Sequence, residues 1–277
     1  MKKILVPTDF SACADIAWET AIQLSKQLDA ELHLFHAASL PDNWIDLPVE
    51  QGIKKTVNER IASVARDKLD ERKALAEQKG INVLTHFSEG EFLKSIVEFV
   101  DQVSIDLVIM GSHGVSGKRE WFIGSNTQKV VRKINKTVLV VKDRIPEDNF
   151  KNVVFVSGLN ENEKEVFQSF IEFISAFDIN RVHLLAVNLS GFFNQPTILM
   201  NEVLEDFKAL AKGYECQTHF YPDYSIEAGI RHFTEDYNVD LIGISNKAKH
   251  PIKRIFLGSN VEMIVNHSKV PVLSLDD

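Results

Sequence analysis

The sequence lacks long hydrophobic runs and has only two cysteines among 277 residues. No stretch approaches the roughly 20 apolar residues of a membrane-spanning helix. The first apolar run ends after Val6 at Pro7, which is too short for the core of a signal peptide. Cys13 and Cys216 lie far apart and fit no metal or redox spacing. These absences predict a soluble protein of the reduced cytoplasm with no membrane contact.

The sequence also lacks a concentration of positive charge. It carries 31 Lys and Arg residues against 39 Asp and Glu residues, with a net charge of −8. Because phosphate contacts require a basic face, we do not expect binding to nucleic acid. Hydrophobic residues make up 44% and charged residues 25% of the chain, which is an ordinary globular balance. The length is sufficient for two domains.

The two halves of the sequence align with each other. The matched stretches are KKILVPTDFS with KNVVFVSGLN (2–11 with 151–160), SIDLVIMGSH with NVDLIGISNK (104–113 with 238–247), and TVLVVKD with PVLSLDD (137–143 with 271–277). Such self-similarity indicates a duplicated domain. We predict a first domain over residues 1–143, a short linker over residues 144–150, and a second domain over residues 151–277.

Within the first half, apolar runs alternate with helical patterns. The expected strands are Ile4–Val6, Glu31–His36, Val83–Phe87, Leu107–Met110 and Val138–Val141, and the expected helices are Ser11–Leu28, Lys54–Gln78, Glu91–Val103 and a segment ending near Ile134. Buried strands separated by helices indicate a parallel sheet covered on both faces. We therefore predict two tandem doubly wound α/β domains, each with a parallel five-stranded sheet. The second half has a shorter middle, around Gly191–Leu210.

A glycine-rich stretch, GSHGVSGKREWFIGSN, follows the fourth expected strand. In open parallel sheets, ligands bind beyond the carboxyl ends of the strands. If the first and fourth strands are neighbours, this stretch and Pro7-Thr8-Asp9 converge on one cleft. The stretch fits neither the P-loop pattern nor the Rossmann fingerprint. Taken by themselves, its residues leave open a phosphate site and an ordinary glycine-rich turn.

The spacing Gly111-x2-Gly114-x9-Gly124-Ser125 resembles the nucleotide motif of the universal stress protein family. ILVPTDFS at the start, DLVIMGSHG before the glycine-rich stretch and TVLVVK at the end of the first half match the layout of that family in order. The chain is similar to a tandem member of this family. The match covers the first half nearly from end to end and the second half more weakly.

The resemblance implies an adenine-nucleotide site in the first half, for ATP or AMP. The adenosine would contact Pro7, Thr8 and Asp9, with Asp9 near the ribose, and the backbone of Ala37 would meet the adenine edge. The implied phosphate-binding residues are Gly111, Gly114, Gly124, Ser125 and Asn126. Asn126 departs from the apolar residue usual there, and His113 either touches a phosphate or faces solvent. Mg²⁺ is compatible with a triphosphate, although no distinctive carboxylate pair is present for it, and no metal site is predicted.

The second half retains little of this motif. Gly158, Ser245 and Ala248 stand at the positions of Asp9, Gly111 and Gly114, and of the motif only the Gly-Ser step survives. That step is Gly258-Ser259. The second half is therefore predicted to be a degenerate structural partner. Its remaining basic residues are interpreted as a solvated loop; they are Lys247, Lys249, His250, Lys253 and Arg254.

Other candidates have plain structural interpretations. His33 and His36 stand three apart on an expected strand, so they face opposite sides and are interpreted as structural. Cys13 could have a pKa lowered by a helix terminus, although a small helix residue is the simpler interpretation. The phenylalanines of residues 167–177 are expected in the core, and Gly191-Phe192-Phe193 is either a partner patch or a core lid.

The last strand of each half is expected at a sheet edge, where apolar strands invite pairing. The resemblance suggests that these strands pair within one chain as an intrachain pseudo-dimer, and that a homodimer of tandem chains is also open. No general base is evident beside the phosphates, so efficient phosphoryl transfer is not expected. The alternatives are a slow ATPase or adenylate-forming enzyme, and an interaction protein without a ligand.

Overall fold

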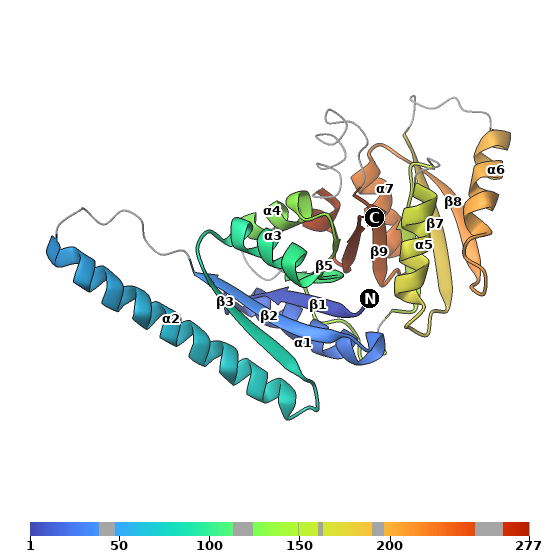
Figure 1. Cartoon of the computed structure of the whole chain (residues 1–277). Helices are drawn as coiled ribbons and strands as arrows, with labels where there is room; N and C mark the ends of the chain where they lie inside the picture. The colour runs from blue at the N-terminus through green and yellow to red at the C-terminus, as the bar shows by residue number, and fades with distance from the viewer. Residues whose placement is uncertain are drawn as a thin grey trace. The chain divides into compact units, whose positions relative to one another are not determined.

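The computed structural model describes residues 1–38, 48–112, 124–148, 150–159, 163–189, 197–246 and 263–276. The chain forms two compact units, residues 1–110 and 111–277. Each unit is a layered arrangement of helices on a sheet (Figure 1). The predicted α/β class with mostly parallel strands is confirmed.

Within its described residues, the first unit contains four parallel strands in the order β3-β2-β1-β4. Their bounds are Lys3–Pro7 for β1, Glu31–Ala38 for β2, Val83–Glu89 for β3 and Leu107–Gly111 for β4. In register, Pro7 of β1 lies beside Phe35 of β2, and Leu5 lies beside Val108 of β4. The first and fourth strands are paired, which is the condition that the expected cleft required. Both strands therefore end at the same edge of the sheet.

The helices α1 and α2 cover one face of this sheet, and α3 covers the other (Figure 1). Their bounds are Ala12–Leu28 for α1, Pro48–Glu77 for α2 and Phe92–Val103 for α3. Ser11 is the N-cap of α1, as predicted, and its Oγ accepts a hydrogen bond from the Ala14 N–H at 3.3 Å. The α2 helix begins at Pro48, earlier than the predicted Lys54.

The part of the second unit that the structure describes contains six strands in the order β5-β10-β9-β6-β7-β8. Their bounds are Thr137–Val141 for β5, Asn152–Val156 for β6, Arg181–Leu189 for β7, Cys216–Asp223 for β8, Leu241–Ser245 for β9 and Val272–Leu275 for β10. β5 and β10 pair antiparallel, with Val140 beside Val272, and β10 is parallel to β9. The predicted pairing of the two terminal strands within one chain is therefore confirmed.

The helices of the second unit include α4 (Ser125–Lys133), α5 (Glu163–Ile174), α6 (Thr197–Lys208) and α7 (Ile226–Asp236). α5 and α6 share a face of the sheet, where the rings of Phe167 and Phe207 lie 5.8 Å apart. The predicted core position of the α5 phenylalanines is confirmed, because Phe167, Phe170 and Phe173 are buried. The Gly191-Phe192-Phe193 prediction lies outside the described residues.

Candidate functional site

The turn after β1 is held by Thr8. The Thr8 N–H donates to the Phe35 carbonyl at 2.8 Å, and the Thr8 Oγ1 accepts from the Phe10 N–H at 2.9 Å. Phe10 has a φ of 64°, a left-handed conformation that is uncommon for a residue other than glycine. The Thr8 side chain is buried, so these bonds fix the turn and present the residue between them, Asp9, at the surface.

Asp9 projects an exposed carboxylate from this turn. Its Oδ1 accepts a hydrogen bond from the Ser11 N–H at 3.0 Å. Burial raises the pKa of the Asp9 carboxyl, but the hydrogen bonds from Ser11 and the charge of the nearby His36 lower it by more than burial raises it. The net pKa therefore lies below its usual value. Asp9 is therefore an anionic acceptor at neutral pH, suited to the hydroxyl groups of a ligand.

His36 ties the end of β2 to the same turn, a contact that sequence reasoning missed. Its Nδ1 donates to the Thr8 carbonyl at 2.7 Å, and its ring lies 4.6 Å from that of Phe10. The carbonyl can only accept, so the Nδ1 carries the proton. His33 contacts Phe99 of α3, on the other face of the sheet, so the predicted opposite facing of the two histidines is confirmed. The predicted contact residue Ala37 follows His36 and lies beside Ser88 of β3.

An apolar cleft of about 420 Å³ opens next to the Asp9 turn, between that turn and α2. Its volume falls within the roughly 300–1,000 Å³ of small-molecule pockets. Arg72 borders it, with its guanidinium 4.9 Å from the Phe10 ring centre and 2.6 Å from Asp15 Oδ1. The lining residues are Phe10, His36, Val57, Arg60, Ile61, Val64, Ala65 and Lys68.

The second unit holds the residues that follow β4. The carbonyl of Gly111 accepts from the Thr127 Oγ1 at 3.0 Å, which ties the end of β4 to the first turn of α4. The Ser112 N–H donates to the Val141 carbonyl at 2.8 Å. The Ser112 hydroxyl is buried and has no hydrogen-bond partner within the described ranges. Sequence reasoning singled out neither Ser112 nor Thr127.

The α4 helix begins with a glycine cap. Gly124 is the N-cap, and having no side chain it supplies no capping hydrogen bond. Ser125 is the first residue of the helix and lies in its first turn beside Asn126. The first-turn N–H groups of an α-helix favour anions when no side chain satisfies them. The predicted residues His113, Gly114, Gly258 and Ser259, together with the basic loop 247–254, lie outside the described residues.

The second unit repeats the turn of the first unit without its carboxylate. The Ser157 N–H donates to the Leu185 carbonyl at 2.9 Å, and the Ser157 Oγ accepts from the Leu159 N–H at 2.9 Å. Leu159 is left-handed, with a φ of 60°, as Phe10 is. Gly158, at the position of Asp9, has no side chain to offer a ligand. The scaffold of the turn is thus duplicated, whereas the acceptor group is not.

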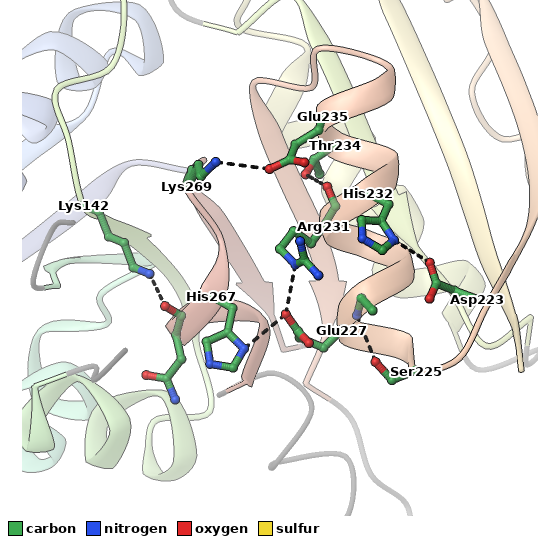
Figure 2. Close-up of polar contacts among 12 residues, drawn as sticks. Lys142, Asp223, Ser225, Glu227, Arg231, His232, Thr234, Glu235, His267 and Lys269 are labelled. Carbon is green, nitrogen blue, oxygen red and sulfur yellow. Dashed lines mark hydrogen bonds and ion pairs between the residues drawn. The ribbon is translucent and has the colours of Figure 1, made fainter. Parts of the chain in front are cut away.

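A smaller cleft of about 110 Å³ lies between α7 and residues 264–270. Its charged groups neutralise one another: Glu227 pairs with Arg231 at 3.6 Å and with His267 at 3.1 Å, as Figure 2 shows. Lys269 pairs with Glu235 at 3.1 Å. This cleft is well below the volume of ordinary ligand pockets. We interpret it as a packing gap bridged by ion pairs.

Two further classes of site find no support in the part of the chain that the structure describes. Within those residues, no three His, Cys, Asp or Glu side chains cluster as metal ligands would. Burial and the charge of Asp9 raise the pKa of the Cys13 thiol, so the suggestion of a lowered pKa is wrong. No described helix is both long enough and apolar enough to cross a membrane.

The fold and the duplicated turn define a tandem doubly wound α/β protein. The sequence model of the universal stress protein family matches residues 1–142 and 195–275, and the chain belongs to that family. Universal stress protein Slr1230 of a Synechocystis species is 21% identical over 293 residues and covers 99% of both chains, in agreement with the tandem arrangement.

Two other relatives illustrate the half-length and full-length similarity. Universal stress protein MJ0531 of Methanocaldococcus jannaschii is 32% identical over 141 residues, which are 51% of this chain and 82% of that protein. The crystal structure of a universal stress protein from Archaeoglobus fulgidus superposes with a TM-score of 0.77 at 19% identity. It covers 99% of this chain and 98% of that one, and so shares its fold.

Proposed function

We propose that the first matched segment, residues 1–142, binds an adenine nucleotide, either ATP or AMP. The protein would act in a stress response by changing its conformation or its interactions when the nucleotide binds. The observation that carries this proposal is the Asp9 carboxylate. It is kept ionised and is held by a fixed turn at the carboxyl end of β1, where open parallel sheets bind ligands.

The role given to Asp9 is to accept a hydrogen bond from a ribose hydroxyl, as acidic residues do in other nucleotide folds. The neighbouring Pro7 and Thr8 would line the adenosine, and the backbone of Ala37, at the end of the adjacent strand, would meet the adenine edge. His36 supports this arrangement from outside, because its bond to the Thr8 carbonyl ties the two strand ends together.

The phosphates would lie on the glycine-rich segment. Gly111 and Gly124 do not have positive φ angles, and the φ of Gly124 is −53°. Any residue could adopt that backbone, so freedom of φ does not explain the glycine. A glycine there leaves room for a close neighbour, and a phosphate bound to first-turn N–H groups of α4 is such a neighbour. Gly114, Ser125 and Asn126 complete the proposed phosphate site. The triphosphate oxygens themselves would hold Mg²⁺.

The second matched segment is proposed to bind no nucleotide. Its turn keeps the Ser157 hydrogen bonds but replaces the carboxylate with Gly158. Ser245 and Ala248 would place side chains where backbone N–H groups need to approach a phosphate. The surviving Gly258-Ser259 step is then a remnant. The proposed stoichiometry is one nucleotide for each chain.

Calorimetric titration of Mg·ATP, and separately of AMP, into the nucleotide-stripped full chain tests this proposal. One site per chain is expected. The aligned glycines provide a matched pair of variants: Gly124→Val should abolish binding, because its side chain fills the phosphate position, and Gly258→Val should leave binding unchanged. Circular dichroism of both variants checks that each is folded.

Two sites per chain would show that the second segment is functional and would overturn its assignment as degenerate. Loss of binding in Gly258→Val but not in Gly124→Val would overturn the assignment of the nucleotide site to the first segment. No heat at two temperatures would favour a ligand-free interaction protein. Steady-state phosphate release well above background, lost on Asp9→Ala, would instead make the protein an ATPase.

A further inference from the structure

A pair of histidines, one buried and one half-buried, lies between the sheet of the first unit and α3. The Nδ1 of His33, on β2, lies 3.0 Å from the Nε2 of His86, on β3. His33 is 2% exposed, and the ring of Phe99 covers the pair from α3, with its centre 4.4 Å from that of His86. The other ring nitrogen of His33 lies 2.7 Å from the Glu31 carboxylate.

The second unit holds the same pair at corresponding positions. The Nδ1 of His183, on β7, lies 2.9 Å from the Nε2 of His219, on β8. His183 is 1% exposed, and Phe233 of α7 covers the pair, with its ring centre 4.8 Å from that of His219. Tyr237, the C-cap of α7, adds a ring 5.2 Å from that of His183. The two units therefore share this pair even though their glycine motifs differ.

The charged residue two positions before the first histidine of each pair differs in sign between the two units. Glu31 opens β2 two residues before His33, and Arg181 opens β7 two residues before His183. The Glu31 carboxylate contacts the first pair directly. The Arg181 guanidinium acts on the second pair through its charge and is itself bound to Glu215 at 3.0 Å. A carboxylate favours a protonated pair, and a guanidinium opposes it.

The number of protons on such a pair determines whether its internal hydrogen bond can form. In the neutral first pair, His33 donates from Nε2 to Glu31, and its Nδ1 accepts from the Nε2–H of His86. A first added proton can reside on the other nitrogen of His86, which leaves both hydrogen bonds intact. A second proton would place two N–H groups face to face across 3.0 Å, so the pair would have to separate.

We propose that the two histidine pairs are acid-sensitive latches between the sheets and the covering helices α3 and α7. Each latch accepts one proton with its internal hydrogen bond intact and opens when the second proton enters. Glu31 sets the first latch to accept its first proton at a higher pH than the second latch, which Arg181 opposes. This inference is independent of the nucleotide site.

Further charged and aromatic groups face each pair, and burial lowers the pKa of the histidines in both. In the first unit they are Glu31, Lys3 of β1 and the uncharged Phe99; in the second they are Arg181, Glu215, Phe233 and Tyr237. Burial and the charge of His33 lower the pKa of His86 to about 4. Burial, His219 and Arg181 lower the pKa of His183 to about 4. Burial also lowers the pKa of His33 and of His219.

These directions fix the sign of the pH dependence. Unfolded histidines bind protons near pH 6.5, whereas the most shifted members of the folded pairs resist them down to about 4. The unfolded or opened state therefore holds more protons within this window. The stabilisation that the pairs contribute is fully present above pH 6.5 and is lost as the pH falls toward 4.

NMR titration of the histidine side chains in the nucleotide-free full chain, from pH 8 to pH 3.5, tests the latches. Both pairs are expected to titrate in two steps below the exposed histidines. Glu31→Gln should lower the pH of the first titration step in the first pair only. Arg181→Gln should raise the pH of the first titration step in the second pair only. Glu89→Gln, which removes an equal charge from the end of β3, should move neither.

Opening is read from hydrogen exchange at α3 and α7. Through the second step, the protection of these amides should fall about tenfold per pH unit, the slope of one-proton linkage. Titration of all four histidines in single steps near 6.5 would overturn the proposal, as would unchanged titrations in the two charge variants. If a variant does not fold, the two-step titration of the unsubstituted protein still decides the question.

Discussion

At the scale of single residues, the candidate site depends on a side chain that holds a turn through its own hydrogen bonds. The next residue in that turn faces the surface and can vary. The Thr8 and Ser157 hydroxyls accept the same backbone bond in the two units, and Phe10 and Leu159 adopt the same left-handed conformation. Position 9 can therefore change to glycine in the second copy without loss of the turn. The sequence pointed to Asp9, but nothing in the local pattern indicated that Thr8 would hold it.

Gly243 of β9 is a residue whose small size is required by packing. A Cβ placed there would lie 2.5 Å from ring atoms of Phe170 and 3.2 Å from Phe155, both of which are fully buried. Rigid rings in a filled core cannot move away cheaply. We expect Gly243→Ala to destabilise the protein by about 1–3 kcal/mol in urea denaturation.

A neighbouring position offers the control. Ser274 of β10 is buried, and its hydroxyl has no partner among the described residues. Ser274→Ala removes an unsatisfied polar group, so its free energy of unfolding should equal or exceed that of the unsubstituted protein. Equal effects of the two substitutions would contradict the packing argument at Gly243.

At the scale of elements, the sequence predicted most strands and helices because their signals are local. Ser11 caps α1 and Leu28 ends it, as the pattern indicated. The start of α2 was missed: the charged pattern begins near Lys54, but the helix begins at Pro48. Proline is favoured in the first turn of a helix, so a usable signal was present at that position.

The serine caps of α1 and α7 provide an element-scale prediction. The Ser11 Oγ accepts from the Ala14 N–H, and the Ser225 Oγ accepts from the Ala228 N–H at 3.1 Å. Each cap satisfies a backbone donor that the helix leaves unpaired. Ser11→Ala and Ser225→Ala should each lower the free energy of unfolding by about 0.5–2 kcal/mol.

Thermal denaturation of the two single variants and of the double variant measures these costs. Because the caps lie in different units and share no partner, the double variant should show the sum of the single effects. A double variant no less stable than either single variant would refute independent capping. Ser175→Ala, at an exposed helix end, serves as a serine control outside the N-caps.

At the scale of the whole molecule, the two sequence repeats meet in the strand pair β5 and β10. The repeat boundaries of 143 and 150 remain a prediction, because the compact units divide the chain at residue 110. Beyond the strand pair, the Lys142 ammonium donates to the Asn266 carbonyl (Figure 2). Lys142 ends the first matched segment, and Asn266 belongs to the second.

Lys142 gives a pH prediction with a definite sign. Burial lowers the pKa of its ammonium to about 8, below the ordinary value of 10.5. Between these values the unfolded chain binds more protons, so this group makes the protein more stable as the pH rises from 8 to 10.5. In urea denaturation at pH 7, 9 and 10, the free energy of unfolding of the unsubstituted protein should rise relative to that of Lys142→Met as the pH increases.

The same series with Lys136→Met, a lysine just before β5, controls for the loss of a positive charge. Parallel pH profiles for the unsubstituted protein and Lys142→Met would mean that Lys142 titrates as an exposed lysine. That result would contradict a buried ammonium at this strand end.

The sequence by itself determined the features that rest on local patterns: the order of strands and helices, the duplication, the glycine spacing and the family resemblance. Only the tertiary structure decided the contacts between distant segments. His33 meets His86 across 53 residues, and His183 meets His219 across 36, because the parallel register makes them diagonal neighbours on one face of the sheet. The His36 bond to Thr8 and the pairing of β5 with β10 have the same origin. Periodicity reports which face of an element is buried, whereas register between strands depends on packing that no local stretch encodes.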